Sequence, residues 1–255
     1  MWDILKHPLT RNLDIDDPKT TYIRKQLIRN KPFLRKIYED WYGWIVSRIP
    51  HGEGRVLELD LGAGFLDRYF PDLITSEVFF CPFVNIILDG CSLPFAEGSL
   101  KAIVLVDVFR HIPDIEAFLR EAARGLGKRG KVLMVEPWVT TWSCFVYTHL
   151  HHEPLNVSEQ GWSFVGSGPL TSANSALPCI VFERDRMLFE EKNRQFVVDN
   201  IIIEKPFVYI LSGGVSLRSL MPGFSYEFWK KLESLLKKWM DKLGMFAKIE
   251  LSRIP

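Results

Sequence analysis

The chain carries little net charge and few cysteines. Its 255 residues have a formal net charge of +1, which gives no general electrostatic attraction for nucleic acid, so no nucleic-acid partner is expected. The four cysteines, at positions 81, 91, 144 and 179, show no C-x-x-C spacing. Their spacing disfavours a zinc site or a disulfide framework and is typical of proteins from a reducing compartment.

Long apolar runs are missing as well. The first residues lack the apolar core of a signal peptide. The longest apolar runs have the length of a strand and are interrupted by charges, so no membrane-spanning helix is predicted. Apolar residues nevertheless make up 47% of the chain, enough for a sizeable core. We therefore expect a cytoplasmic protein without integral membrane association.

Two helices are predicted in the first fifty residues. Asp17 before Pro18 is typical of a helix start, because a capping carboxylate precedes a proline at the first helical position. The pair Lys31-Pro32 begins a second helix. Its apolar positions recur at helical spacing, namely Phe33, Leu34, Ile37, Tyr38, Trp41, Tyr42 and Ile45. We expect residues 1–50 to form a helical cap separate from the core.

Strand and helix patterns alternate over residues 51–138. Several of the strand candidates are apolar on both faces, as a parallel sheet covered by helices requires. Residues 114–126 have the spacing and caps of a helix. This alternation predicts an α/β, doubly wound domain whose core binds a cofactor. The strand candidates are 56–61, 73–78, 85–88, 102–108 and 131–138.

The rest of the chain divides into two segments. Residues 139–200 are rich in aromatic residues, histidine, glycine, serine and proline, which indicates an insertion after the fifth strand that forms a lid. Residues 201–255 are predicted to complete the same domain. They offer one or two strands near 200–211, a helix over 226–243 and a last strand at 245–251.

A glycine turn follows the first predicted strand. Gly62 and Gly64 lie where that strand ends, and glycine there lets a ligand approach the backbone closely. Glu77 ends the second predicted strand, where an acid accepts hydrogen bonds from ribose hydroxyls. Asp67 stands where a dinucleotide fold has its third glycine, and its charge would repel a pyrophosphate. The turn therefore favours a ribose-bearing cofactor without phosphates.

The stretch from Val56 to Trp138 resembles the class I S-adenosylmethionine-dependent methyltransferases, specifically their small-molecule, type 11-like group. The matching motifs, in order, are Glu58-Leu59-Asp60-Leu61-Gly62-Ala63-Gly64, Glu77, Asp89-Gly90 with Leu93-Pro94-Phe95, residues 106–112 and residues 130–133. The resemblance implies a mostly parallel, seven-stranded, Rossmann-like sheet and S-adenosylmethionine as cofactor. It also implies the cofactor-binding residues Glu58, Asp60, Gly62, Gly64, Glu77, Asp89, Gly90 and Asp107.

Asp60 departs from the family's first motif, which opens with glycine. Its side chain either crowds the methionine half of the cofactor or places a negative charge near the ammonium or sulfonium. The first outcome would leave a degenerate, non-catalytic binding protein on the same fold, and this alternative stays open.

Methyl transfer requires little acid–base catalysis from the protein. The nucleophile and the methyl group must be held in line in a dry pocket, and a general base is needed only when the nucleophile carries a proton. His111, Glu136 and His151 are the candidate catalytic residues; for His111 and Glu136 the alternative is packing or hydrogen bonding at the sheet edge. The run 149–153 matches no standard zinc spacing, so no metal is predicted.

The predicted helix over 226–243 combines an apolar stripe with many lysines. Docking of the stripe on the domain is favoured, because most globular helices are amphipathic for that reason. Peripheral binding to an anionic membrane, with a lipid-linked acceptor, stays open as an alternative. The sequence as a whole predicts a cytoplasmic, S-adenosylmethionine-dependent methyltransferase with a small-molecule substrate.

Overall fold

A seven-stranded sheet organises the chain. The computed structural model describes residues 6–10, 17–59, 64–150, 154–163 and 173–254. The strand order is β3-β2-β1-β4-β5-β7-β6, and only β7 runs antiparallel to its neighbours. This confirms the predicted fold class. The strands are β1 Arg55–Glu58, β2 Leu73–Glu77, β3 Ile86–Ile87, β4 Leu100–Val106, β5 Leu126–Pro137, β6 Phe196–Glu204 and β7 Phe246–Arg253.

The strand order reverses beside β1. Val56 of β1 pairs in parallel with Leu73 of β2 on one side and with Ala102 of β4 on the other. The chain therefore leaves β1 toward β2 and β3, and then returns to β4 on the opposite side. In open α/β sheets, such a reversal opens a ligand site beyond the carboxyl ends of the two strands.

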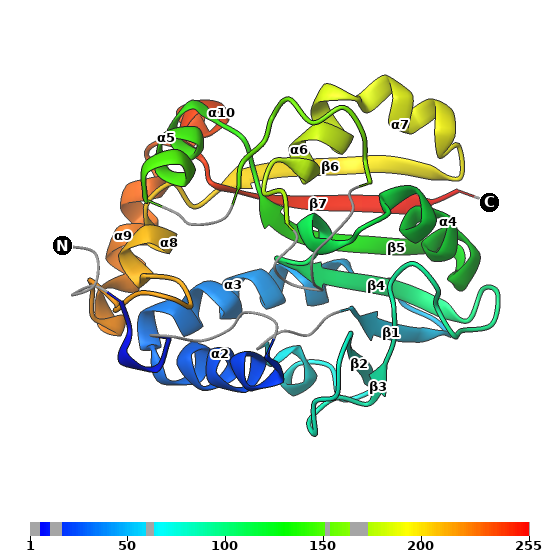
Figure 1. Cartoon of the computed structure of the whole chain (residues 1–255), viewed down its shortest axis with the longest axis horizontal. Coiled ribbons are helices and arrows are strands. Elements are labelled where there is room, and N and C mark those ends of the chain that lie inside the picture. Colours follow the sequence, from blue (N-terminus) through cyan, green and yellow to red (C-terminus); the bar gives the residue numbers. More distant parts are fainter. Residues whose placement is uncertain (1–5, 11–16, 60–63, 151–153, 164–172, 255) are drawn as a thin grey trace.

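Helices cover both faces of the sheet (Figure 1). On one face, α2 Pro18–Asn30 and α3 Pro32–Arg48 pack against residues such as Val104 and Leu133. On the other face, α4 Ile115–Gly125, α6 Leu177–Cys179, η4 Ile180–Arg184 and α7 Arg186–Lys192 pack against residues such as Ile103 and Met134. Alternate residues of one strand thus face two cores, and this explains why these strands are apolar throughout.

The two N-terminal helices begin as predicted, but they are not separate from the core. The carboxylate of Asp17 accepts a hydrogen bond from the Lys19 N–H at the start of α2. All seven apolar positions predicted for the second helix are buried. They lie against β1, β4 and β5, so α3 is one of the layers that cover the sheet.

The segment expected as an insertion also contributes to the core. It begins with α5 Thr141–Leu150, and its second half forms α6, η4 and α7. Leu177, Ile180 and Phe182 are buried against the sheet. The edge strand β6 begins at Phe196, which lies inside the predicted insertion. Only part of residues 139–200 therefore lies outside the regular layers.

The C-terminal segment differs from its prediction at two places. Where a second strand was expected, the chain forms α8 Val208–Ser212. The single helix expected over 226–243 is divided into α9 Tyr226–Ser234, η6 Lys237–Trp239 and α10 Met240–Leu243. Asp40 of α3 holds this segment to the domain, because it accepts hydrogen bonds from the Tyr226 hydroxyl and from Lys205.

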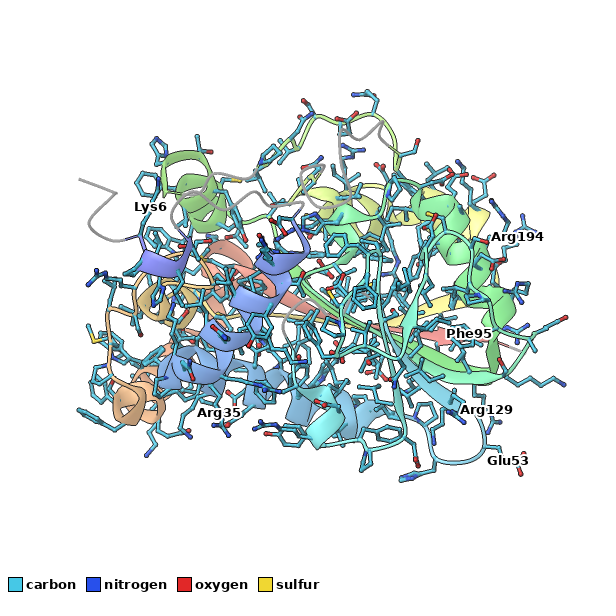
Figure 2. The ribbon with its side chains drawn as sticks, turned by 60° about the horizontal axis from the view of Figure 1, so that its bottom comes forward. Lys6, Arg35, Glu53, Phe95, Arg129 and Arg194 are labelled. Carbon is cyan, nitrogen blue, oxygen red and sulfur yellow. The ribbon has the colours of Figure 1, made fainter. Side chains whose placement is uncertain are left out.

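The molecule has two distinct ends. Glu53, Arg129 and Arg194, which lie near the starts of β1, β5 and β6, gather at one end, and Lys6 and Arg35 lie at the other (Figure 2). The carboxyl end of β5 leads into α5, beside α8, α9 and α10 (Figure 1). Among the described residues, no helix combines the length and the apolar character needed to cross a membrane.

Candidate active site

Two buried carboxylates end neighbouring parallel strands. Glu58 closes β1 and Glu77 closes β2, and their exposed fractions are 2% and 1%. The Ser76 hydroxyl donates to the carbonyl of Glu58 over 3.0 Å and ties the two strand ends together. The two strand ends lie beside the reversal in strand order, where open α/β sheets bind their ligands. This edge of the sheet is therefore the strongest candidate for a binding site.

The side chain of Glu58 is only partly satisfied by the protein. Tyr42 of α3 hydrogen-bonds to it, but its Oε2 atom has no hydrogen-bond partner among the described residues. Burial, and then the charge of Asp67, raise the pKa of Glu58 well above its ordinary value, while Lys25 and Tyr42 lower it. A positively charged group beside Oε2 would reverse the effect of burial.

Gly64 lies directly under the hydroxyl of Tyr42. A Cβ at this position would be 2.0 Å from that oxygen, so no side chain fits without a shift. The same hydroxyl accepts a hydrogen bond from the Phe65 N–H over 3.3 Å. Tyr42 of α3 therefore packs closely against Gly64 and Phe65. Two further predicted cofactor-binding residues, Asp60 and Gly62, lie outside the described residues.

Asp89 and Gly90 form a tight turn after β3. The Asp89 carboxylate accepts a hydrogen bond from the Cys91 N–H over 2.8 Å, and the chain closes in a bridge between Asp89 and Ser92. Gly90 is buried against Leu59, which follows β1, and a Cβ on Gly90 would lie 2.9 Å from that side chain. The turn thus packs beside the end of β1, where a ligand on Glu58 and Glu77 would extend.

Asp107 follows β4 in a strained conformation. Its φ angle is 67°, a left-handed conformation that is uncommon for residues other than glycine. Its carboxylate pairs with both terminal nitrogens of Arg110, at 2.6 and 3.2 Å. Arg110 is itself buried and also donates from Nε to Nε2 of His111 over 3.1 Å. Strain at the carboxyl end of a central strand is typical of functional sites.

The contact with Arg110 fixes the tautomer of His111. A guanidinium can only donate, so Nε2 of His111 accepts and the ring proton of neutral His111 is on Nδ1. In this arrangement Nε2 is occupied by Arg110. His111 therefore has to part from Arg110 before Nε2 can accept a proton from a substrate.

Glu136 is a cap for the chain that follows β4. It is fully buried, and its Oε1 accepts hydrogen bonds from the N–H groups of Val108 and Phe109, each over 2.9 Å. Burial, followed by the negative charge of Asp107, raises the pKa of Glu136 to about 8. This geometry assigns Glu136 the task of holding the loop with Asp107 and Arg110 in place. Its predicted role as a general base is not supported by any exposed oxygen.

The remaining sequence candidates are spread out. His151 lies outside the described residues. His149, at the end of α5, donates from Nδ1 to the Phe145 carbonyl over 2.9 Å, and its ring stacks on the Phe145 ring. Within the described part of the chain, no group of three or more histidine, cysteine, aspartate or glutamate side chains could hold a metal ion.

Four residues of this site were missed in the sequence. Tyr42 and Tyr38 carry the correct spacing for a buried helix face, and nothing in that spacing reveals that the Tyr42 hydroxyl reaches Gly64. Lys25 of α2 is 9% exposed and lies close enough to Glu58 and Asp67 to interact with both charges. Arg110 stands next to His111, but only the fold brings its guanidinium onto Asp107.

The strand order, the single antiparallel strand and the acids beyond β1 and β2 define a class I methyltransferase. The comparison with protein families agrees with this assignment. Residues 42–134 match a family model described as a methyltransferase domain, and this range includes Glu58, Gly64, Glu77, Asp107 and most of β5. Over these residues the chain is similar to that family. The chain is therefore an S-adenosylmethionine-dependent methyltransferase.

Solved structures share the whole fold. A geranyl diphosphate C-methyltransferase from Streptomyces coelicolor A3(2), solved with Mg²⁺, geranyl diphosphate and S-adenosyl-L-homocysteine, has a TM-score of 0.54 and 12% identity. The match covers 98% of this chain and 92% of that one. A geranyl diphosphate methyltransferase in complex with SAM has a TM-score of 0.55 and 13% identity, over 91% of this chain and 90% of that one. At this identity the likeness concerns the fold.

No curated protein matches the sequence. The fit of the cofactor therefore has to be judged from the residues themselves. S-adenosylmethionine carries ribose hydroxyls, which suit the buried acid Glu77, and a positive charge, which suits the unsatisfied Oε2 of Glu58. The described residues of the site fit the cofactor in both respects.

Proposed function

We propose that this methyltransferase transfers the methyl group of S-adenosylmethionine to a small-molecule acceptor by in-line displacement. The observation that carries the proposal is the pair of buried acids, Glu58 and Glu77, at the ends of adjacent strands beside the reversal in strand order. The bound cofactor supplies a methyl group that its sulfonium already activates. The chain has to bind and orient the cofactor and the acceptor, and it has to exclude water from the site.

On the cofactor side, the two acids divide the work. Glu77, which closes β2, accepts hydrogen bonds from the ribose hydroxyls. Glu58 offers Oε2 to a positive charge, while Tyr42 hydrogen-bonds to the carboxylate and the charge of Lys25 favours its ionised form. The turn with Gly90 closes the site beyond β3. Together these contacts fix the direction in which the methyl group points.

On the acceptor side, the residues beyond β4 provide a polar wall. Asp107 and Arg110 form an ion pair in which the Arg110 side chain is buried. Burial, and then the negative charge of Asp107, raise the pKa values of the Tyr38 and Tyr209 phenols. The phenols therefore stay protonated and can donate hydrogen bonds to an acceptor. His111, next to Arg110, is the described residue we assign to accept a proton when the acceptor carries one.

The size of the acceptor follows from what covers this edge. Buried residues of α3, such as Tyr38 and Tyr42, lie against the glycine turn. Behind Arg110, Asn174 donates its N–H to the carbonyl of Arg110 over 3.2 Å and brings the second half of the 139–200 segment onto the same edge. Cover from both sides favours a small molecule over a polymer.

Calorimetry of cofactor binding tests the proposal. We expect saturable binding of S-adenosylhomocysteine to the full chain. Glu77→Gln should weaken this binding by about tenfold or more, because a charge-assisted hydrogen bond contributes about 1.5–3 kcal/mol. The matched control is Glu97→Gln, an exposed acid on the loop before β4, which should bind like the wild type.

The acceptor is tested separately with a labelled methyl group. Radiolabelled S-adenosylmethionine and a cell extract, separated beforehand into small molecules and macromolecules, give two substrate pools. We expect label in the small-molecule pool, and less of it with Glu77→Gln. Absence of binding heat up to millimolar cofactor would refute the cofactor site, and label in macromolecules alone would refute the acceptor class.

A further inference from the structure

The C-terminal helix α9 exposes its apolar side. Five large apolar side chains between residues 224 and 239 are exposed by 43–89%. Phe228 and Leu232 lie on one face of α9, while Phe224 precedes the helix in η5 Gly223–Ser225 and Leu235 and Trp239 follow it in the turn and in η6. We call this the outward stripe, and it consists of Phe224, Phe228, Leu232, Leu235 and Trp239. The prediction that the apolar stripe docks on the domain is therefore wrong for Phe228, Leu232, Leu235 and Trp239, whereas Trp229 of the same predicted stripe packs against the core.

Polar contacts hold the opposite face of the same helix to the protein. The Tyr226 hydroxyl donates to Asp40 over 2.6 Å. Lys230 donates to the same carboxylate over 2.9 Å. Glu233 is buried and accepts from the N–H groups of Phe207 and Val208, each over 2.7 Å. Tyr226, Lys230 and Glu233 follow helical spacing, and the rings of Tyr226 and Trp229 also pack against the core, so α9 is docked by polar contacts together with two aromatic side chains.

Lysines flank the outward stripe. Lys231, Lys237, Lys238 and Lys242 are all exposed, and the ammonium of Lys242 lies 5.4 Å from the centre of the Trp239 ring. The acids in the same segment are Glu227, Asp241 and the buried Glu233. Aromatic and aliphatic side chains between lysines are the composition of helices that lie in the interface of an anionic bilayer.

We propose that the outward stripe and its lysines bind the surface of an anionic lipid membrane. The apolar side chains enter the interface, and the lysine ammonium groups stay at the level of the lipid phosphates. A second copy of the chain is a poorer partner, because a symmetric contact would bring the same lysines together. The inference concerns a surface separate from the cofactor site and does not depend on the acceptor.

The position of this surface gives the protein an orientation on the membrane. α9 and α10 lie at the end of the molecule where β5 leads into α5 (Figure 1). β1 and β4 run parallel to β5, so Glu58 and Asp107 lie toward that end too. The opposite end, with Glu53 and Arg129, faces away from the bilayer (Figure 2).

Vesicle sedimentation tests the proposal on the full chain. We expect the chain to sediment with vesicles of equal parts phosphatidylglycerol and phosphatidylcholine at low salt, and to be released by high salt. It should stay in the supernatant with vesicles of phosphatidylcholine alone. Lys237→Glu with Lys238→Glu should weaken binding about fivefold or more for each lysine. Phe228→Ser with Trp239→Ser should abolish sedimentation.

A matched control and a second measurement keep the test decisive. Met187→Ser with Lys128→Glu changes an equally exposed methionine and lysine outside the stripe, and it should sediment like the wild type. Circular dichroism establishes that each variant is folded. A wild-type chain that stays in the supernatant at low salt overturns the proposal. Equal sedimentation of the stripe variant and the control overturns it as well, as does a stripe-dependent dimer without vesicle binding.

Discussion

The hydroxyl oxygen of Tyr42 occupies the place that a side chain on Gly64 would need. A Cβ there would lie 2.0 Å from that oxygen, and 3.2 Å from the ring carbon that bears it. The same hydroxyl reaches Glu58, the acid at the end of β1. One side chain of α3 thus excludes a larger residue at position 64 and hydrogen-bonds to the buried acid Glu58.

This relationship predicts a rescue. Gly64→Ala should lower the free energy of unfolding by about 1–3 kcal/mol, because the fully buried Tyr42 has to shift. In a chain that also carries Tyr42→Phe, the same change should cost much less, since the nearest remaining atom lies at 3.2 Å. Urea denaturation of both single variants and the double variant measures the coupling. Strictly additive costs would contradict the contact.

Binding of the cofactor should release protons. In the free protein, burial and the charge of Asp67 raise the pKa of Glu58, which favours the neutral acid. A cation beside Oε2 lowers this pKa again, so Glu58 loses its proton when the cofactor binds. Affinity should therefore rise with pH. Calorimetry in buffers of different ionisation enthalpy counts the protons, and Glu58→Gln should remove the release.

Glu136 should make stability fall as the pH rises. Its pKa is raised from 4.5 to about 8 in the folded chain, so it contributes most below pH 4.5, and this contribution is lost as the pH rises to about 8. The slope should approach about 1.4 kcal/mol per pH unit between these values. In Glu136→Gln, the amide oxygen still accepts from Val108 and Phe109, and this slope should disappear.

A second substitution at position 136 distinguishes the loss of the hydrogen-bond acceptor from the loss of the titrating charge. Glu136→Leu leaves two buried N–H groups without their acceptor, so it should be less stable than Glu136→Gln at every pH, by about 1–3 kcal/mol for each group. Thermal unfolding across the pH range measures all three chains. A pH slope that persists in Glu136→Gln would assign it to another group.

Arg110 should be essential for the loop beyond β4. Its guanidinium is almost fully buried and donates two hydrogen bonds to the Asp107 carboxylate, so Arg110→Met removes these bonds and should cost about 1.5–3 kcal/mol of stability. Adding Asp107→Asn to this variant should recover part of the loss. Nitrogen NMR provides a second readout, because wild-type His111 should show the Nδ1–H tautomer. Two independent, additive losses would contradict the pairing.

Local patterns account for the elements that were predicted well. The cap at Asp17, the helical spacing from Phe33 to Ile45 and the apolar runs of the parallel strands are each contained within a few residues of one another. The predicted acids Glu58 and Glu77 are buried at strand ends for the same reason, since a strand that ends in an acid can be recognised from its own sequence.

Contacts between distant segments account for what was missed. The spacing of α3 places Tyr42 on a buried face but does not show that its hydroxyl meets Gly64. The stripe of α9 has the pattern of a docked helix, yet Asp40 and the N–H groups of α8 bind its polar face instead. In the sequence, Glu136 resembles a general base at a strand end. Only the fold brings the N–H groups of Val108 and Phe109 onto its carboxylate, so that it acts as their hydrogen-bond acceptor.

The sequence by itself determined the parallel strands, the helices α2, α3 and α4 and the acids at the edge of the sheet, because periodicity and capping act along a continuous stretch of chain. Only the tertiary structure decided which side of α9 faces water, which oxygen of Glu58 remains for a ligand and which nitrogen of His111 is occupied. Each of these depends on a partner far away in the sequence, and hydrogen bonding across that distance leaves no periodic pattern in the residues.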